Sequence, residues 1–213
     1  MIPFRNKKNL YLVTSQEYCL QKTTLEVARE AIAGGIDIIQ MREKTFANDE
    51  LIKLGKELST LSKKHNIVFI ANDDPCLAKE INADGVHLGQ SDILKHPIYK
   101  VRELLGKDKI IGVSTHCLEQ VKEANSLDID YIAYGPIYKT KTKDYTVGPE
   151  KIEDVIKTSR FPVVFIGGIN KENIRAVLKR GARNMAMIRE ISESPDIKAK
   201  IKELKEIINE YNN

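Results

Sequence analysis

Two pairs of charged residues have the types and the spacing to do chemistry. Asp73 and Asp92 each follow a short apolar run, and Arg42 and Lys44 follow another. Two carboxylates at one sheet edge repel each other unless a cation or basic groups lie between them, and Mg²⁺ is commonly held by one or two carboxylates plus substrate phosphates. An arginine fork and a lysine ammonium suit phosphate oxygens, although a lone pair of this kind is also typical of solvated loops. Together the four residues predict a magnesium and phosphate site.

The elements that must position these residues alternate regularly between strand and helix. Short apolar runs predict strands at residues 10–14, 36–41, 67–71, 86–89, 109–113, 131–134, 161–166 and 184–188. Helical spacing follows at residues 23–33, 48–61, 75–81, 99–105 and 118–126, from residue 149, from 170 to 181, and at 196–211. This alternation over 213 residues predicts the α/β class and a (β/α)8 TIM barrel, with residues 1–213 as a single domain.

Helix starts in this pattern have recognisable N-caps. We expect Asn48 and Asn170 to cap the helices that follow them, and Asp74 to cap a helix that opens at Pro75. In a barrel of this kind the active site lies at the C-terminal ends of the strands. Asp73 and Asp92 are therefore expected to meet there as strand endings, whereas Asp74 serves the helix.

The remaining strand ends carry further candidates for the same pocket. A Gly167-Gly168 pair before a helix lets backbone amides approach a phosphate; two glycines alone are equally typical of a simple turn, but their position in a barrel favours phosphate binding. His87 lies inside a strand and is expected to be a core residue, while His116 follows a strand and is open as a polar contact or proton carrier. Other polar residues at strand ends or in the long loop after the sixth strand are Gln40, Asn72, Gln90, Ser114, Thr140, Thr142 and Lys143.

Composition and the cysteines exclude several classes of protein. Hydrophobic residues make up 42% and charged residues 30%, which is typical of neither a disordered nor a membrane protein. No run approaches the roughly 18 apolar residues of a membrane span, and the start lacks the features of a signal peptide, so a cytoplasmic protein is expected. The three cysteines are odd in number and lack CxxC spacing, which indicates reduced thiols and argues against a disulfide framework or structural zinc.

The charge pattern points to small anionic ligands. The formal net charge is +4, and Lys139, Lys141 and Lys143 cluster locally. Few aromatic residues and no basic stripe accompany them, so phosphorylated small molecules are expected as partners, without nucleic acid or membrane. The oligomeric state stays open, and a homo-oligomer is compatible with the sequence.

Six stretches in order resemble the thiamine-phosphate synthase family along nearly the whole chain. They are Gln40-Met41-Arg42-Glu43-Lys44, Asn72-Asp73, Gly85-Val86-His87-Leu88-Gly89-Gln90-Ser91-Asp92, Gly112-Val113-Ser114-Thr115-His116, Gly135-Pro136-Ile137-Tyr138 with Thr140-Lys141-Thr142-Lys143, and Gly167-Gly168-Ile169. The resemblance implies that 4-amino-5-hydroxymethyl-2-methylpyrimidine diphosphate and a thiazole phosphate are joined with loss of pyrophosphate. The family's reaction is thought to pass through a pyrimidine carbocation, so positioning and water exclusion should matter more than a general base.

The same resemblance implies a role for each matching residue. Asp73 and Asp92 would bind Mg²⁺, the implied cofactor. The pyrimidine diphosphate would be held by Gln40, Met41, Arg42, Glu43, Lys44, Asn72, Ser114 and Lys143, of which Arg42, Lys44, Ser114 and Lys143 are the expected catalytic residues. The thiazole phosphate would be held by Thr140, Lys141, Thr142, Gly167, Gly168, Ile188 and Arg189.

One departure from the family pattern keeps two alternatives open. Where the family usually has Val-Ser-Ala-Ile at the last strand end, this chain has Ile188-Arg189-Glu190-Ile191, so Arg189 either adds a charged grip or fills the pocket. A thiazole tautomerase of the same superfamily would need no diphosphate site, and Arg189 and His116 are compatible with it. A phosphate-ligand sensor on a degenerate barrel is the non-catalytic alternative. The retained Asp73 and Asp92 favour the synthase over both.

Overall fold

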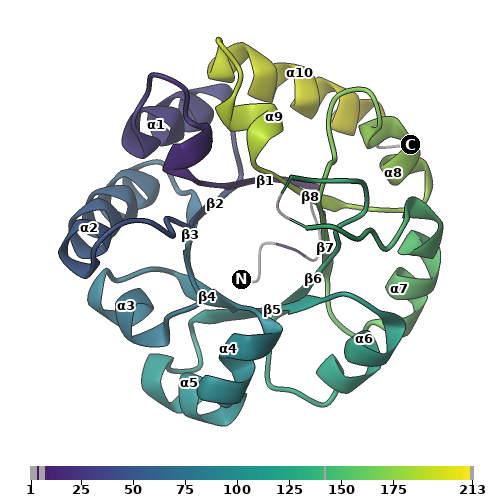
Figure 1. Ribbon diagram of the computed structural model, residues 1–213, viewed down its shortest axis with the longest axis horizontal. Coiled ribbons are helices and arrows are strands. Elements are labelled where there is room, and N and C mark those ends of the chain that lie inside the picture. Colours follow the sequence, from purple (N-terminus) through teal and green to yellow (C-terminus); the bar gives the residue numbers. More distant parts are fainter. Residues whose placement is uncertain (1–3, 5–7, 142, 212–213) are drawn as a thin grey trace.

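A closed parallel barrel forms the centre of the protein. The structure, a computed structural model, describes residues 4, 8–141 and 143–211 (Figure 1). Within these residues each of the eight strands pairs in parallel with the next, and β8 pairs with β1. The strands are β1 (Asn9–Val13), β2 (Ile38–Met41), β3 (Val68–Asn72), β4 (Gly85–Leu88), β5 (Ile110–Thr115), β6 (Tyr131–Tyr134), β7 (Val163–Ile166) and β8 (Asn184–Met187). The predicted (β/α)8 TIM barrel is confirmed.

Helices surround the barrel in the connections between strands (Figure 1). They are η1 (Gln16–Tyr18), α1 (Thr24–Gly34), α2 (Asn48–Lys64), α3 (Pro75–Glu80), α4 (Gln90–Lys95), α5 (Ile98–Leu105), α6 (Leu118–Ala124), η2 (Pro149–Lys151), α7 (Ile152–Thr158), α8 (Ile174–Lys179), α9 (Arg189–Ser192) and α10 (Ile197–Glu210). The short η1, α4 and α9 were not predicted, because so few residues show no helical period.

Two hydrophobic cores, one on each face of the strands, explain why the strand sequences are continuous apolar runs. Alternate strand residues such as Leu10 and Leu12 pack against helix residues in the outer core. Tyr11, Ile38 and Tyr131 belong to a second cluster, made almost wholly of strand residues, that fills the inside of the barrel. Both faces of each strand are therefore buried, and the polar strand ends are left at the barrel mouth.

Only one of the three predicted N-caps is confirmed. The Asp74 side chain accepts hydrogen bonds from the amides of Cys76 and Leu77 at the start of α3. The prediction for Asn48 is wrong, since the N-cap of α2 is the preceding residue, Ala47. That for Asn170 is also wrong: its side chain closes a turn by accepting from the amides of residues 172 and 173, and α8 begins at Ile174 with Asn173 as its N-cap.

In the described part of the chain, none of the helices has both the length and the apolar character that crossing a membrane requires.

Candidate active site

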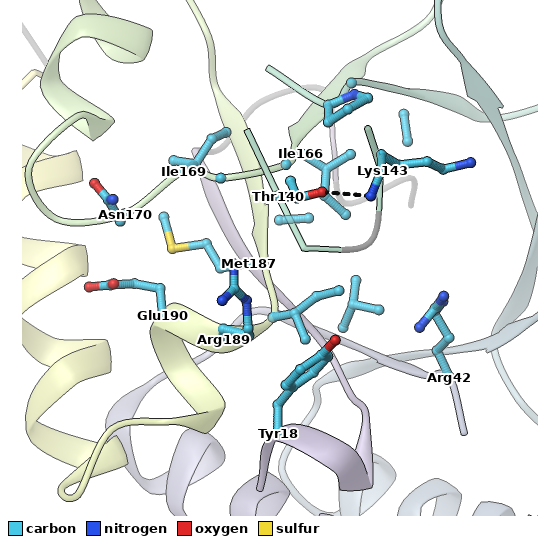
Figure 2. A pocket seen from close by; sticks show the side chains of 18 of the residues that line it. Tyr18, Arg42, Thr140, Lys143, Ile166, Ile169, Asn170, Met187, Arg189 and Glu190 are labelled. Carbon is cyan, nitrogen blue, oxygen red and sulfur yellow. Dashed lines mark hydrogen bonds between the residues drawn. The ribbon is translucent and has the colours of Figure 1, made fainter. Parts of the chain in front are cut away.

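A large cavity opens where the strand ends and their following loops meet. Its volume is about 670 Å³, and its wall includes residues of all eight strands together with Tyr18 of η1. Figure 2 shows Arg42 and Lys143 on one side of this cavity and Arg189, with Tyr18 and Glu190 nearby, on the other. The wall contains ten of the predicted ligand residues: Gln40, Arg42, Asn72, Ser114, Thr140, Lys143, Gly167, Gly168, Ile188 and Arg189. Thr142 lies outside the described residues.

The two acidic residues lie together beside the cavity. Burial, then the negative charge of Asp92, raises the pKa of Asp73 to about 6, while the charges of Lys44 and Arg42 act in the opposite direction. This effect requires two carboxylates in close contact with two cations near them. Sequence spacing predicted this meeting, although Asp73 and Asp92 are not part of the cavity wall.

Asp92 also stabilises the start of a helix, a role that was predicted for Asp74 and not for Asp92. It lies in the first turn of α4, and its carboxylate accepts a hydrogen bond of 3.1 Å from the Gly89 amide. The expectation that Asp92 ends a strand is therefore wrong, because β4 stops at Leu88 and the chain turns into α4. The Asp92 carboxylate thus holds the start of this helix and also shares a hydrogen bond with the Asp73 carboxyl group.

The donor set of this acidic pair fits Mg²⁺. Among the described residues no third His, Cys, Asp or Glu joins the two carboxylates. Mg²⁺ usually keeps several waters and binds through one or two carboxylates plus substrate phosphates, so two acids are enough. Zinc and other metals that require three or four protein ligands fit less well.

Two members of the predicted diphosphate set have their side chains elsewhere. Met41 is buried in the outer core, because neighbouring residues of β2 point to opposite faces and Gln40 takes the inner one. The buried Glu43 carboxylate accepts from the Thr14 and Thr24 hydroxyls, at 2.7 and 2.9 Å, and from the Gln16 amide at 2.6 Å. Glu43 thus anchors the chain before α1, and its negative charge would repel an anionic ligand.

The two basic residues of the same stretch differ in position. Arg42 lines the cavity, and its amide donates to the Thr14 hydroxyl at 3.2 Å. Lys44 is exposed and lies outside the wall, although its charge acts on Asp73. Arg42 is thus the residue that links the acidic pair to the cavity.

His87 combines a core position with a place in the cavity wall. It is 8% exposed, and burial lowers the pKa of its imidazole to about 4. Its Nδ1 is 2.9 Å from the Tyr131 hydroxyl, and its Nε2 is 2.9 Å from the Ser114 hydroxyl. The prediction of a core histidine is confirmed. No sequence pattern indicated that its ring contacts the Ser114 and Tyr131 hydroxyls.

The glycine pair after β7 packs tightly under the loop after β6. Gly167 and Gly168 have φ of +102° and +64°, and a Cβ on Gly167 would lie 2.4 Å from the Pro136 Cα. Side chains are thereby excluded, and the backbone itself forms this part of the wall. Within the described residues the amides of Gly168 and Ile169 donate to no partner, so they are available to an anionic ligand.

The loop after β6 contributes other residues to the cavity wall than those predicted. Thr140 and Lys143 line the cavity, and the Thr140 hydroxyl accepts from the Lys143 amide at 3.1 Å. Lys141 is exposed and outside the wall, whereas Lys139, which was predicted as part of the lysine cluster but not as a thiazole phosphate ligand, lies in it. His116, which also lines the cavity, is tied to the Gly135 carbonyl through Nδ1 at 2.7 Å.

Arg189 lines the cavity and contacts an aromatic ring. Its guanidinium carbon lies 5.9 Å from the centre of the Tyr18 ring, within the range of a cation–π contact. Glu190 is engaged by Lys200 at 3.0 Å and by the Lys171 amide at 3.3 Å. Arg189 itself forms no ion pair with the part of the chain that is described. Its positive charge is therefore available to an anionic ligand in the cavity.

Comparison with known proteins agrees with this geometry. Residues 10–191 match the family model described as thiamine monophosphate synthase. The chain is 42% identical over 202 residues to a thiamine-phosphate synthase of Shouchella clausii, covering 93% of each chain. It is 40% identical over 203 residues to that of Lawsonia intracellularis, covering 94% of this chain and 92% of the relative.

Solved structures show the same likeness. A thiamine phosphate pyrophosphorylase from Pyrococcus furiosus superposes with a TM-score of 0.88 at 34% identity, over 98% of each chain. One from Bacteroides thetaiotaomicron, at 17% identity and a TM-score of 0.69, shares the fold. Given a match to the family model over most of the sequence and relatives of this identity, the chain belongs to the thiamine monophosphate synthase family.

Proposed function

We propose that this protein is a magnesium-dependent thiamine-phosphate synthase. It would join 4-amino-5-hydroxymethyl-2-methylpyrimidine diphosphate to a thiazole phosphate, giving thiamine phosphate and pyrophosphate. The observation that carries the proposal is that groups able to bind anions lie at two separate places along one cavity. Arg42 and the acidic pair mark the first, and the glycine amides with Arg189 mark the second.

The first site suits a leaving group of high negative charge. In the reaction the bond between the pyrimidine methylene carbon and the diphosphate oxygen breaks, and its electron pair leaves with pyrophosphate. Arg42 and Lys143 in the cavity wall, with Lys44 nearby, supply positive charge where this negative charge develops. Mg²⁺ held by Asp73 and Asp92 would neutralise further charge on the diphosphate.

The second site would hold the nucleophile in place. The lone pair of the thiazole nitrogen forms the new bond to the methylene carbon, so no proton must be removed and no activated protein nucleophile is required. The amides of Gly168 and Ile169 and the Arg189 guanidinium would fix the thiazole phosphate. Holding both partners in one cavity supplies the proximity on which such a displacement depends.

Water is the competing nucleophile, and the cavity wall limits its access. The wall next to the reacting groups includes apolar side chains from the strand ends, among them Ile166, Met187 and Ile188. Capture of the carbocation by water would give the pyrimidine alcohol instead of thiamine phosphate. The charged, water-soluble substrates also favour a cytoplasmic location as part of this proposal.

The proposal is tested by an assay with both substrates in the presence and absence of Mg²⁺. We expect thiamine phosphate and pyrophosphate in equal amounts only when both substrates and Mg²⁺ are present. A tautomerase would convert the thiazole phosphate alone, and a sensor would bind without turnover. Absence of product under every metal condition would contradict the synthase assignment.

A further inference from the structure

A chain of hydrogen bonds runs through the inside of the barrel to the cavity wall. The Tyr11 hydroxyl lies 3.2 Å from the Tyr131 hydroxyl, which is 2.9 Å from Nδ1 of His87. Nε2 of the same ring is 2.9 Å from the Ser114 hydroxyl. Tyr11, Tyr131 and His87 are buried, and Ser114 is half-buried at the wall. The mechanism proposed above uses none of these four residues, although the family resemblance implies that Ser114 holds the pyrimidine diphosphate.

The hydrogens in this chain can be assigned by counting. Each hydroxyl carries one hydrogen, and a neutral imidazole carries one N–H. If Tyr11 donates to Tyr131, Tyr131 donates to Nδ1 and Nε2–H donates to Ser114, every buried hydrogen has an acceptor. The one hydrogen left over belongs to Ser114 and faces the cavity.

The opposite direction leaves a buried donor unpaired. If Ser114 donates to Nε2, then Nδ1–H must donate to Tyr131 and Tyr131 to Tyr11. The Tyr11 hydrogen is then left over, and Tyr131 is the one partner that the described residues provide for it. A doubly protonated imidazole has the same consequence. An unpaired buried donor is costly enough to disfavour that arrangement by roughly tenfold or more.

Packing holds the central tyrosine in place. A Cβ on Gly112 would lie 2.1 Å from the Tyr131 Cζ, so glycine at this position makes room for the ring. On its other side the Phe4 ring stacks on Tyr131 with centroids 4.3 Å apart. Tyr131 therefore has little freedom to turn its hydroxyl away from His87.

We propose that His87 is a positioning residue, held by Tyr131 as the Nε2–H tautomer, which makes the Ser114 hydroxyl a hydrogen-bond donor toward an acceptor atom of the pyrimidine diphosphate. The identity of that ligand rests on the proposed function, whereas the direction of the chain rests on the hydrogen bonds alone. His87 then acts through Ser114 and needs no contact with the reacting atoms.

The tautomer can be measured in the ligand-free protein by ¹⁵N NMR of the histidine rings, with the His87 signals assigned from their loss in His87→Gln. We expect Nε2 to be the protonated nitrogen and Nδ1 the unprotonated acceptor. The same result is expected for Tyr11→Phe, because Tyr131 still has its hydrogen to donate to Nδ1. Tyr131→Phe removes that donor and should give a mixture of tautomers. A wild-type ring protonated at Nδ1 overturns the proposal.

A double-mutant cycle tests whether the effect reaches the ligand through Ser114. We expect Ser114→Ala to raise the KM for the pyrimidine diphosphate roughly tenfold and Tyr131→Phe roughly threefold to fivefold, with the KM for the thiazole phosphate unchanged in both. Tyr131→Phe should add nothing once Ser114 is alanine. If the two substitutions raise the KM for the pyrimidine diphosphate independently, so that their effects multiply in the double variant, the proposal is contradicted.

Controls keep this result separate from folding and from the proposed function. Tyr134→Phe alters a tyrosine of the same strand that packs in the outer core, and its KM values should match the wild type. Thermal unfolding of each variant identifies a loss that is merely structural. If no thiamine phosphate forms at all, the synthase assignment fails. The NMR measurement of the His87 tautomer still determines the direction of the hydrogen bonds between Tyr11 and Ser114.

Discussion

The two sides of the cavity bind anions by different means. On the side formed by the ends of β2–β5 and by Lys143 of the loop after β6, the groups are charged side chains beside an acidic pair. At the ends of β7 and β8 the groups are the backbone amides of Gly168 and Ile169 together with the guanidinium of Arg189, which has no ion pair among the described residues. The first side is suited to a group whose charge changes during reaction, and the second to a group that must only be held.

The largest expected effect concerns the acidic pair on the first side. Asp92→Asn should lower kcat on the order of 100-fold to 1000-fold, because it removes a carboxylate from the proposed Mg²⁺ site. The amide oxygen can still accept from the Gly89 amide, so α4 should keep its start and thermal unfolding should change little.

Asp74→Asn is the matched control for that substitution. Asp74 caps α3 with its carboxylate, and asparagine is an equally good cap. Its activity should stay within about twofold of the wild type, since a cap contributes to stability and not to the chemistry. Near-normal turnover of Asp92→Asn, measured beside this control, would remove the metal role.

The pH dependence of metal binding separates the two sides further. Asp73 holds a proton below about pH 6 in the metal-free protein because burial and Asp92 raise its pKa. Since Mg²⁺ must displace this proton, its affinity should fall by up to about tenfold per pH unit below that value and level off above it. Calorimetric titration with Mg²⁺ and pyrophosphate measures this.

Two comparisons decide the cause of that pH dependence. Asp73→Asn should abolish the pH-dependent part of Mg²⁺ binding along with most of the affinity. Binding of the thiazole phosphate alone should change with pH only through the second pKa of its own phosphate, about 6, and this step should be the same in Asp73→Asn as in the wild type. Loss of that step in Asp73→Asn contradicts the division of the cavity.

Arg189 tests the second side in the same way. Arg189→Ser restores the residue type usual in the family and removes a charge that has no ion-pair partner among the described residues. We expect the KM for the thiazole phosphate to rise about fivefold to tenfold, with the KM for the pyrimidine diphosphate unchanged.

Arg183→Ser serves as its control, because Arg183 is exposed just before β8, at the other end of the strand that leads to Arg189. It should leave both KM values as they are. An unchanged thiazole phosphate KM in Arg189→Ser would show that the guanidinium does not contact the ligand, while a lower value would show that it obstructs the site.

The smallest effect on activity is expected from Glu43, whose buried carboxylate accepts three hydrogen bonds from the protein. Glu43→Gln replaces an acceptor of three hydrogen bonds by a group with one acceptor oxygen, so about 1–3 kcal/mol of unfolding free energy should be lost. Urea unfolding measures this loss. The KM values should change less than twofold once the variant is folded, and a large change in the pyrimidine diphosphate KM would restore Glu43 to the binding site.

The sequence was sufficient for the fold and for the meeting of Asp73, Asp92 and Arg42. Strands buried on both faces leave long apolar runs, and their C-terminal ends must converge in a barrel. The sequence was insufficient to assign ligand residues where neighbours in one motif point to opposite faces of a strand, as Gln40 and Met41 do. It also gave no sign of the bond between His87 and Ser114, since contacts across a barrel depend on register and leave no local pattern.

The most direct test is a crystal structure with Mn²⁺ in place of Mg²⁺, pyrophosphate and the thiazole phosphate. The anomalous signal of Mn²⁺ locates the metal without reference to the ligands. We predict a peak between the carboxylates of Asp73 and Asp92, pyrophosphate between that peak and Arg42, and the thiazole phosphate at the Gly168 and Ile169 amides. A metal bound away from both carboxylates, or both anions on the same side of the cavity, would contradict the account.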